Sequence, residues 1–243
     1  MVYPSAWDDF LNSPVFILNL DRQPDRLERC INHAKDAGFT DIRRFAAIDG
    51  NDEGVVNDLW KQLGNPTTQP LTERVANVKH VQGVLLTHLM LYRHIHENSI
   101  PFAVILEDDC AFHKDWSNLG PKYLQITPKD YDVCYLGHHS QWGTEGHVMS
   151  FPVYCTNAYC ITLQGATYLH TLLSDVCASG TGNIQAIDLI IFDLMAEYIK
   201  TMDDTKFCKW YIWNAAMFPD DTAKKHPTDG YKDNGLVYQE YIT

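Results

Sequence analysis

The sequence predicts an α/β protein in which a mixed, mostly parallel β-sheet is flanked by helices. Three short apolar runs carry this prediction, at residues 14–20, 102–106 and 132–136. Continuous apolar runs of this length are typical of strands that are buried on both faces. Stretches with helical periodicity separate them, and alternating strands and helices favour parallel pairing.

The first of these runs opens a strand–helix–strand unit. Residues 14–20 form the predicted strand, Pro24 stands at a suitable first helical position, and Gly38 ends the helix. Residues 43–48 then read as the next strand. Short connections of this kind indicate a βαβ unit, which normally winds right-handed.

The rest of the chain continues the alternation. A short helix at 55–63 precedes a turn-rich loop at 64–70, and a long amphipathic helix covers 79–98. Beyond the strands at 102–106 and 132–136, we expect a strand at 153–163, a helix at 164–173, a helix at 184–198 and a strand at 207–213. The remaining residues read as a tail that wraps over the domain.

Length and segment order favour one domain. The 243 residues can bury a sizeable core, and no linker, repeat or low-complexity segment divides them. We therefore expect a single domain over 1–243, with a core at 14–213 and a wrapping tail at 214–243.

Composition restricts the partners and the compartment. A net charge of −12 argues against nucleic acid as a partner, because an acidic surface repels phosphate backbones. The longest apolar runs are far short of the roughly 20 residues that a membrane span needs. The N-terminus has no signal-peptide pattern, the C-terminus has no KDEL-type signal, and Cys134, Cys160 and Cys208 lie in apolar runs. Reduced core thiols, and hence a cytoplasmic location, are the expectation.

The sharpest local signal is the acidic triplet Glu107-Asp-Asp109 at the end of a predicted buried strand. In open α/β sheets, ligands bind beyond the carboxyl ends of strands. Adjacent carboxylates repel one another unless a cation offsets their charge. Alternation in an extended chain would point Glu107 and Asp109 the same way, where they could hold Mg²⁺ or Mn²⁺. A solvated acidic turn or a helix cap is the structural alternative.

A second signal follows the first strand, in Asn19-Leu-Asp-Arg-Gln-Pro-Asp-Arg26. Here a strand end meets a helix N-terminus, which is a position suited to phosphate. Arg22 and Arg26 could bind phosphate oxygens. The alternative is an ordinary helix start with surface ion pairs of small energetic weight.

Several isolated residues have both a functional and a structural interpretation. His88 lies on the apolar face of the long helix, where a histidine is usually a satisfied core group. Asp188 is either a general base or an acid favoured by a helix N-terminus. His226 and the pair His138-His139 are candidate third metal ligands or surface histidines.

Taken in order, these segments resemble glycosyltransferase family 25. The resemblance covers residues 14–195 and includes the acidic triplet with the strand before it. Its motifs are 15–28, 45–50, 71–72, 83–89, 100–109, 131–137, 159–166 and 187–188.

The resemblance implies a GT-A-type, Rossmann-like fold, a UDP-sugar donor such as UDP-galactose or UDP-glucose, and Mn²⁺ or Mg²⁺ as cofactor. By position, it implies that the donor is held by Asn19, Leu20, Asp21, Arg22, Arg26, Asp49, His88 and Asp108. It places Glu107 and Asp109 as metal ligands and Asp188 as the catalytic base, while His226 stays a candidate third ligand from the residues alone.

The expected activity is therefore a metal-dependent, inverting transfer of a hexose from a UDP-sugar to an acceptor hydroxyl. A glycan or a protein is the expected acceptor, and lipo-oligosaccharide and collagen-like chains both remain open. The alternatives are a catalytically silent glycan- or protein-binding module and an NDP-sugar hydrolase.

Overall fold

The computed structural model describes residues 3–64, 78–140, 153–178, 186–201, 208–213, 224–225 and 232–239. Its helices are α1 (Trp7–Leu11), α2 (Pro24–Asp36), α3 (Glu53–Gln62), α4 (Val78–Glu97), α5 (Trp116–Ile126), α6 (Leu163–Ala178) and α7 (Ile187–Thr201). Its strands are β1 (Val15–Asn19), β2 (Ile42–Ala46), β3 (Phe102–Glu107), β4 (Cys110–Phe112), β5 (Val133–Ser140), β6 (Tyr154–Thr162), β7 (Trp210–Ile212), β8 (Lys224–Lys225), β9 (Lys232–Gly235) and β10 (Val237–Gln239).

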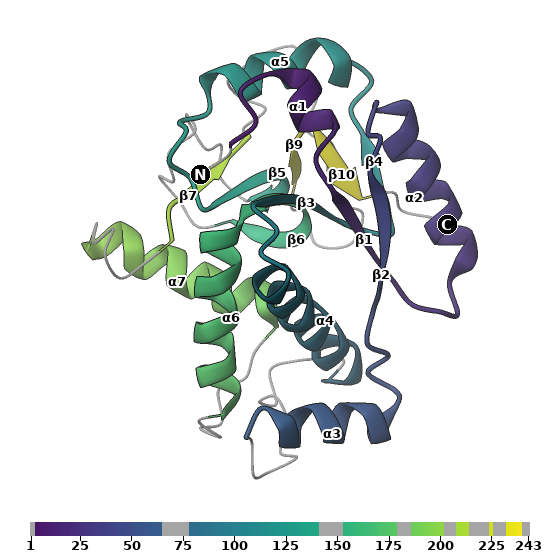
Figure 1. Cartoon of the computed structure of the whole chain (residues 1–243), viewed down its shortest axis with the longest axis vertical. Coiled ribbons are helices and arrows are strands. Elements are labelled where there is room, and N and C mark those ends of the chain that lie inside the picture. Colours follow the sequence, from purple (N-terminus) through teal and green to yellow (C-terminus); the bar gives the residue numbers. More distant parts are fainter. Residues whose placement is uncertain are drawn as a thin grey trace.

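A mixed sheet crosses the centre of the molecule (Figure 1). The strand order is β2-β1-β3-β6-β5-β9-β8, and β7 pairs with β5 outside this path. Pairing is parallel for β1 with β2, β1 with β3 and β5 with β7, and antiparallel elsewhere in this sheet. A mixed sheet flanked by helices confirms the predicted α/β class.

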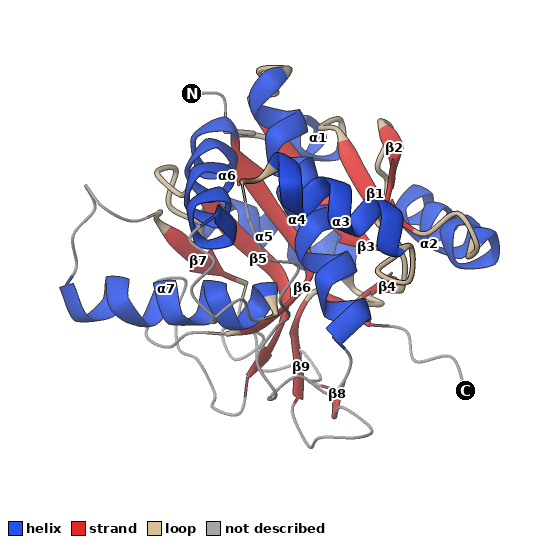
Figure 2. Ribbon diagram, turned by 90° about the horizontal axis from the view of Figure 1, so that it is seen from below, coloured by secondary structure: helices blue, strands red, loops and turns tan. Residues whose placement is uncertain are grey.

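Two hydrophobic cores cover the two faces of the sheet. Alternate residues of one strand enter different cores, as the strand period of two requires: Phe16 packs in one core, and Val15 and Ile17 pack in the other. Helices α3, α4, α6 and α7 contribute to the first core, and α1, α2 and α5 to the second. Figure 2 shows α4 and α6 side by side over one face. Continuous apolar runs are needed here because both faces of each strand are buried.

The predicted elements that lie in the described ranges are present, with modest shifts at their ends. The helix that starts at Leu163 is longer than expected, and the late strand is shorter, at Trp210–Ile212. No element was expected between 110 and 131, where β4 and α5 occur. Because β4 has three residues and α5 contains Gly120 and Pro121, neither gives a clear sequence pattern.

The tail contributes to the sheets. Strand β9 pairs with β5, and β10 pairs with β4, the strand that follows the acidic triplet.

Among the described residues, no helix combines the length and apolar character needed to cross a membrane. All seven cysteines are free thiols.

Candidate functional site

The two sequence signals meet because their strands are neighbours. Strands β1 and β3 pair in parallel with Leu18 opposite Glu107, so both strands end at the same edge of the sheet. The Asn19 side-chain amide donates a hydrogen bond to Asp108 Oδ2 over 2.6 Å. This contact joins positions 89 residues apart in the chain.

Arg26 binds two of the three acidic side chains. From the first turn of α2, its guanidinium lies 2.6 Å from Asp108 Oδ1 and 2.9 Å from Asp109 Oδ2. The buried Nε of Arg26 has no hydrogen-bond partner among the described residues, so this donor of the guanidinium is unsatisfied.

The predicted alternation within the triplet is wrong. Strand β3 ends at Glu107 and the chain turns at Asp108 and Asp109. Because the extended backbone ends at Glu107, the alternation of side chains along a strand does not set the direction of the Asp109 side chain. Instead, Asp108 and Asp109 share Arg26, whereas Glu107 turns towards α4 and β6.

A pocket of about 280 Å³ opens at this edge of the sheet. We call it the first pocket. Six residues that the sequence singled out for a donor line it: Leu20, Arg22, Arg26, Asp49, His88 and Asp108. Glu107 lines it as well, while Arg22 pairs with Asp49 across its rim.

Two of the expected donor residues lie beside this pocket rather than in its wall. Asp21 is highly exposed and pairs with Arg44 of β2. Asn19 is buried beneath the wall, where its side chain holds Asp108 and the Gln23 carbonyl oxygen. Asn19 therefore supports the pocket from within the protein.

Two glycines that line the first pocket, Gly50 and Gly83, were not singled out as functional in the sequence. A Cβ on Gly50 would lie 1.6 Å from the Lys79 carbonyl oxygen, and one on Gly83 would lie 2.6 Å from that of Ile48. Helix α4 thus packs backbone to backbone against the loop that carries Asp49. A glycine inside a long helical pattern was the signal available for this contact.

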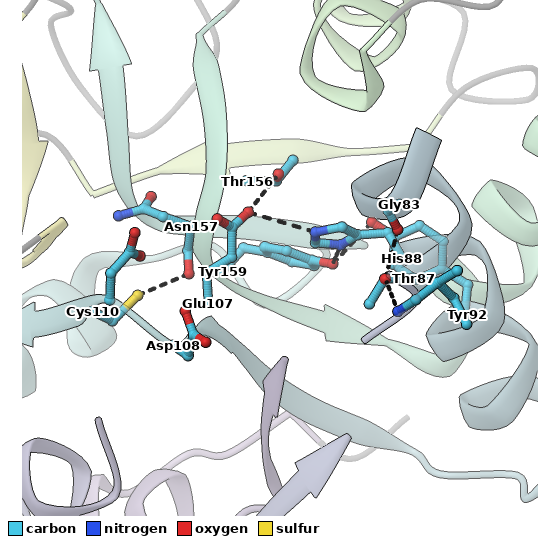
Figure 3. Close-up of polar contacts among 12 residues, drawn as sticks. Gly83, Thr87, His88, Tyr92, Glu107, Asp108, Cys110, Thr156, Asn157 and Tyr159 are labelled. Atoms are coloured by element: carbon cyan, nitrogen blue, oxygen red, sulfur yellow. Dashed lines mark hydrogen bonds and ion pairs between the residues drawn. The ribbon is translucent and has the colours of Figure 1, made fainter. Parts of the chain in front are cut away.

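A buried polar chain holds Glu107 (Figure 3). Thr156 Oγ1 donates to Glu107 Oε1 over 3.2 Å, and His88 Nε2 lies 3.7 Å from the same oxygen. His88 Nδ1 contacts the Tyr159 hydroxyl at 2.8 Å, which in turn contacts that of Tyr92 at 2.9 Å. Burial raises the pKa of Glu107, but His88 and Thr156 outweigh it, and the net pKa is lowered. Glu107 is therefore held as a carboxylate.

Asp109 has the opposite environment. Burial and the neighbouring Glu107 charge raise the pKa of Asp109 to about 7, against the opposing effect of Arg26. Its buried Oδ1 has no hydrogen-bond partner among the described residues. The Asp109 carboxyl is therefore buried and only partly satisfied by hydrogen bonds and ion pairs.

Asp188 lines a second pocket of about 180 Å³. It stands in the first turn of α7, and burial raises the pKa of its carboxyl. The Leu189 amide donates a hydrogen bond to Asp188 Oδ1 over 2.9 Å. Cys155, which has a φ of 77°, lies in the same wall. Strain of this kind in a non-glycine residue is concentrated at functional sites.

The candidate third metal ligands are not brought to the triplet in the described part of the chain. His138 is buried in β5 and lines neither pocket. His226 and the side chain of His139 lie outside the described residues. Within the described ranges, no three His, Cys, Asp or Glu side chains form a group that could hold a metal.

The comparisons with known proteins agree with one another. The model of glycosyltransferase family 25 (LPS biosynthesis protein) matches residues 12–145, more than half of the chain. A "Glycosyltransferase 25 family member" of Aedes aegypti is 24% identical over 169 residues, covering 65% of this chain and 28% of the relative. A second protein of that name, from Drosophila pseudoobscura pseudoobscura, is 23% identical over 167 residues, covering 64% of this chain and 26% of the relative. The chain thus spans little more than a quarter of these relatives.

Two solved structures match the chain at low similarity. A glycosyltransferase involved in the glycosylation of the major capsid of PBCV-1 has a TM-score of 0.45 at 8% identity, over 96% of this chain and 94% of the other. Mouse xyloside xylosyltransferase 1 in its apo form has a TM-score of 0.43 at 9% identity, over 84% of this chain and 86% of the other.

An α/β sheet with an arginine- and carboxylate-lined pocket at its strand ends, matched by this family model, defines the class as a glycosyltransferase. The chain belongs to glycosyltransferase family 25. The resemblance drawn from the sequence motifs is confirmed.

Proposed function

We propose that this glycosyltransferase moves a hexose, galactose or glucose, from a UDP-sugar to a hydroxyl of a glycan or protein acceptor, with inversion at the sugar carbon. The single observation that carries the proposal is the adjacency of the two pockets. The first pocket contains the arginines, the second contains Asp188, and Glu107 lines both.

The first pocket has the chemistry of a diphosphate site. Arg22 and Arg26 line it, and guanidinium groups bind phosphate oxygens bidentately. The adjacent start of α2 adds a helix N-terminus, which favours negative charge.

A divalent cation shared with the donor would be held by two of the three acids of the triplet. Glu107 and Asp109 would be its protein ligands, and phosphate oxygens and water would complete the shell, as is usual for Mg²⁺. Bound there, Mn²⁺ or Mg²⁺ would supply Lewis-acid stabilisation to the departing diphosphate.

The acceptor hydroxyl would lie in the second pocket, beside Asp188. The Asp188 carboxylate takes the hydroxyl proton while the hydroxyl oxygen forms a bond to the sugar carbon. The bond from that carbon to the diphosphate oxygen breaks on the opposite face, and UDP leaves. A carboxylate whose pKa is raised by burial is a stronger base than a solvated one, which suits this step.

The test is a screen of UDP-sugars for Mn²⁺-dependent UDP release, with and without hydroxyl acceptors. Asp109→Asn should abolish the metal-dependent turnover and leave the fold intact by circular dichroism. Asp58→Asn is the matched control, because Asp58 is exposed on α3 and pairs only with Lys61 among the contacts described.

The alternatives give different results in the same assays. A UDP-dependent and Mn²⁺-dependent rise in melting temperature without release from any sugar would indicate a silent binding module. UDP release that never needs an acceptor would indicate a hydrolase. Full activity of Asp109→Asn would contradict the metal site.

A further inference from the structure

Three residues form the boundary between the two pockets. His80, Val84 and Glu107 line both the first and the second pocket. On the proposed function, the nucleotide diphosphate lies on one side of this boundary and the acceptor lies on the other. The bond that breaks must therefore lie next to these three side chains.

The three side chains offer different chemistry to that bond. Val84 is apolar and offers only van der Waals contact. Glu107 offers carboxylate oxygens, which have no hydrogen to donate and repel phosphate oxygens unless a cation lies between them. Of the described residues that line both pockets, His80 is the one able to donate a hydrogen bond.

The position of His80 suits such a contact. It lies in the first turns of α4 and is exposed, so its ring can meet a ligand without leaving a packed core. Four residues along the helix, Val84 lines the same boundary, as helical spacing requires.

We infer that His80 is a donor-contacting residue, whose imidazole N–H donates a hydrogen bond to an oxygen of the phosphate next to the transferred sugar. This inference rests on the proposed function for the placement of the donor. The His80 side chain would place a hydrogen-bond donor from α4 on one side of the diphosphate, with Arg22 and Arg26 on the other side.

The contact is specific for the second phosphate, so binding can test it without turnover. A nucleoside monophosphate lacks that group, whereas a diphosphate has it. Titration calorimetry with UMP and UDP, in the presence of Mg²⁺, should show that His80→Ala binds UMP like the wild type and UDP about tenfold more weakly. His80→Gln keeps an N–H donor and should recover most of the UDP affinity.

Lys79→Ala is the matched control. Lys79 is the neighbouring exposed residue of α4, its side chain pairs with Glu53, and it lines neither pocket. Both nucleotides should bind this variant as they bind the wild type. Thermal melting of all three variants checks that α4 stays folded.

The outcomes separate this inference from the proposed function. If the wild type binds UDP and His80→Ala loses no affinity, or loses the same factor for UMP and UDP, the role of His80 is overturned and the donor pocket stands. If the wild type binds neither nucleotide, the donor pocket itself fails and the role of His80 fails with it. In an active enzyme, His80→Ala should also lower kcat at least tenfold and leave the acceptor KM unchanged.

Discussion

At the scale of single residues, the acidic turn is a site of unequal carboxylates. Glu107 is stabilised as an anion by His88 and Thr156, whereas Asp109 is buried with one unpartnered oxygen. Arg26 offsets part of the charge on Asp108 and Asp109. A cation would remove the remaining repulsion, so the ligand-free protein carries an electrostatic cost at this turn.

That cost predicts a pH-dependent stability. With a pKa of about 7 in the folded protein against 3.8 in an unfolded chain, Asp109 keeps its proton between these values only while folded. Its contribution to stability is therefore lost as pH rises from about 4 to 7, and is constant above that range. From pH 5 to pH 8, the unfolding free energy of Asp109→Asn, measured relative to the wild type in urea without metal, should rise by about 3 kcal/mol. An advantage that does not change with pH would show that the carboxyl is not perturbed.

Asp188 carries the prediction for proton transfer. Asp188→Asn keeps the size of the side chain and an oxygen that can accept from the Leu189 amide, but it cannot take the acceptor proton. We expect kcat to fall by about 10² to 10⁴, with the affinity for UDP unchanged in calorimetry. Asp193→Asn, further along α7 and lining neither pocket, is the control. A kcat close to that of the wild type would assign the base elsewhere.

At the scale of elements, the close approach of α4 to the β2–α3 loop shapes the first pocket. Gly83 makes this approach possible, because a Cβ there would lie 2.6 Å from the Ile48 carbonyl oxygen and 2.9 Å from the Gly50 amide nitrogen. The neighbouring Thr87 hydroxyl accepts a hydrogen bond from the Ile48 amide over 2.8 Å and strengthens the same contact.

Gly83→Ala should therefore separate the helix from the loop. We expect a loss of about 1 to 3 kcal/mol in unfolding free energy and a weaker affinity for UDP, since Asp49 and His88 lie on the two separated elements. Gly54→Ala, on α3, meets only the Asp52 side chain at 3.3 Å and should be neutral or stabilising. Equal stability of the two variants would contradict the close contact.

At the scale of the whole molecule, the late strand β10 packs beside the strand that follows the acidic turn and so supports the site. Strand β10 pairs with β4 directly after the acidic turn, with Val237 opposite Phe112, and Val237 is completely buried. The tail was expected to wrap over the domain, and its described strands belong to the sheets. That the whole chain forms one domain stays a prediction.

Val237→Ala tests this support. Removing its two methyl groups from the core should cost about 2 kcal/mol of unfolding free energy and lower the melting temperature. Gln239→Ala, on the same strand but partly exposed, should change stability by less than about 0.5 kcal/mol. If Val237→Ala were as stable as Gln239→Ala, β10 would not belong to the cooperatively folded unit.

Much of the fold could be predicted from the sequence, because buried strands must be continuous apolar runs and α4 must be amphipathic. The positions of Arg22, Arg26, Asp49 and His88 in one pocket agree with the motif order. The short strand β4 and the helix α5 could not be predicted, because three residues and a helix with an internal Pro121 leave no periodic pattern.

The sequence by itself determined the α/β class, the family and the chemistry that the site can contain, because periodicity and residue type are local properties. Only the tertiary structure decided which groups meet. At the turn after Glu107, Asp108 and Asp109 both contact Arg26. The approach of α4 and α7 to the same strand end brings His80, Val84 and Glu107 into the walls of both pockets and Asp188 into the wall of the second. Such contacts depend on the path of the backbone between distant segments, which no local pattern encodes.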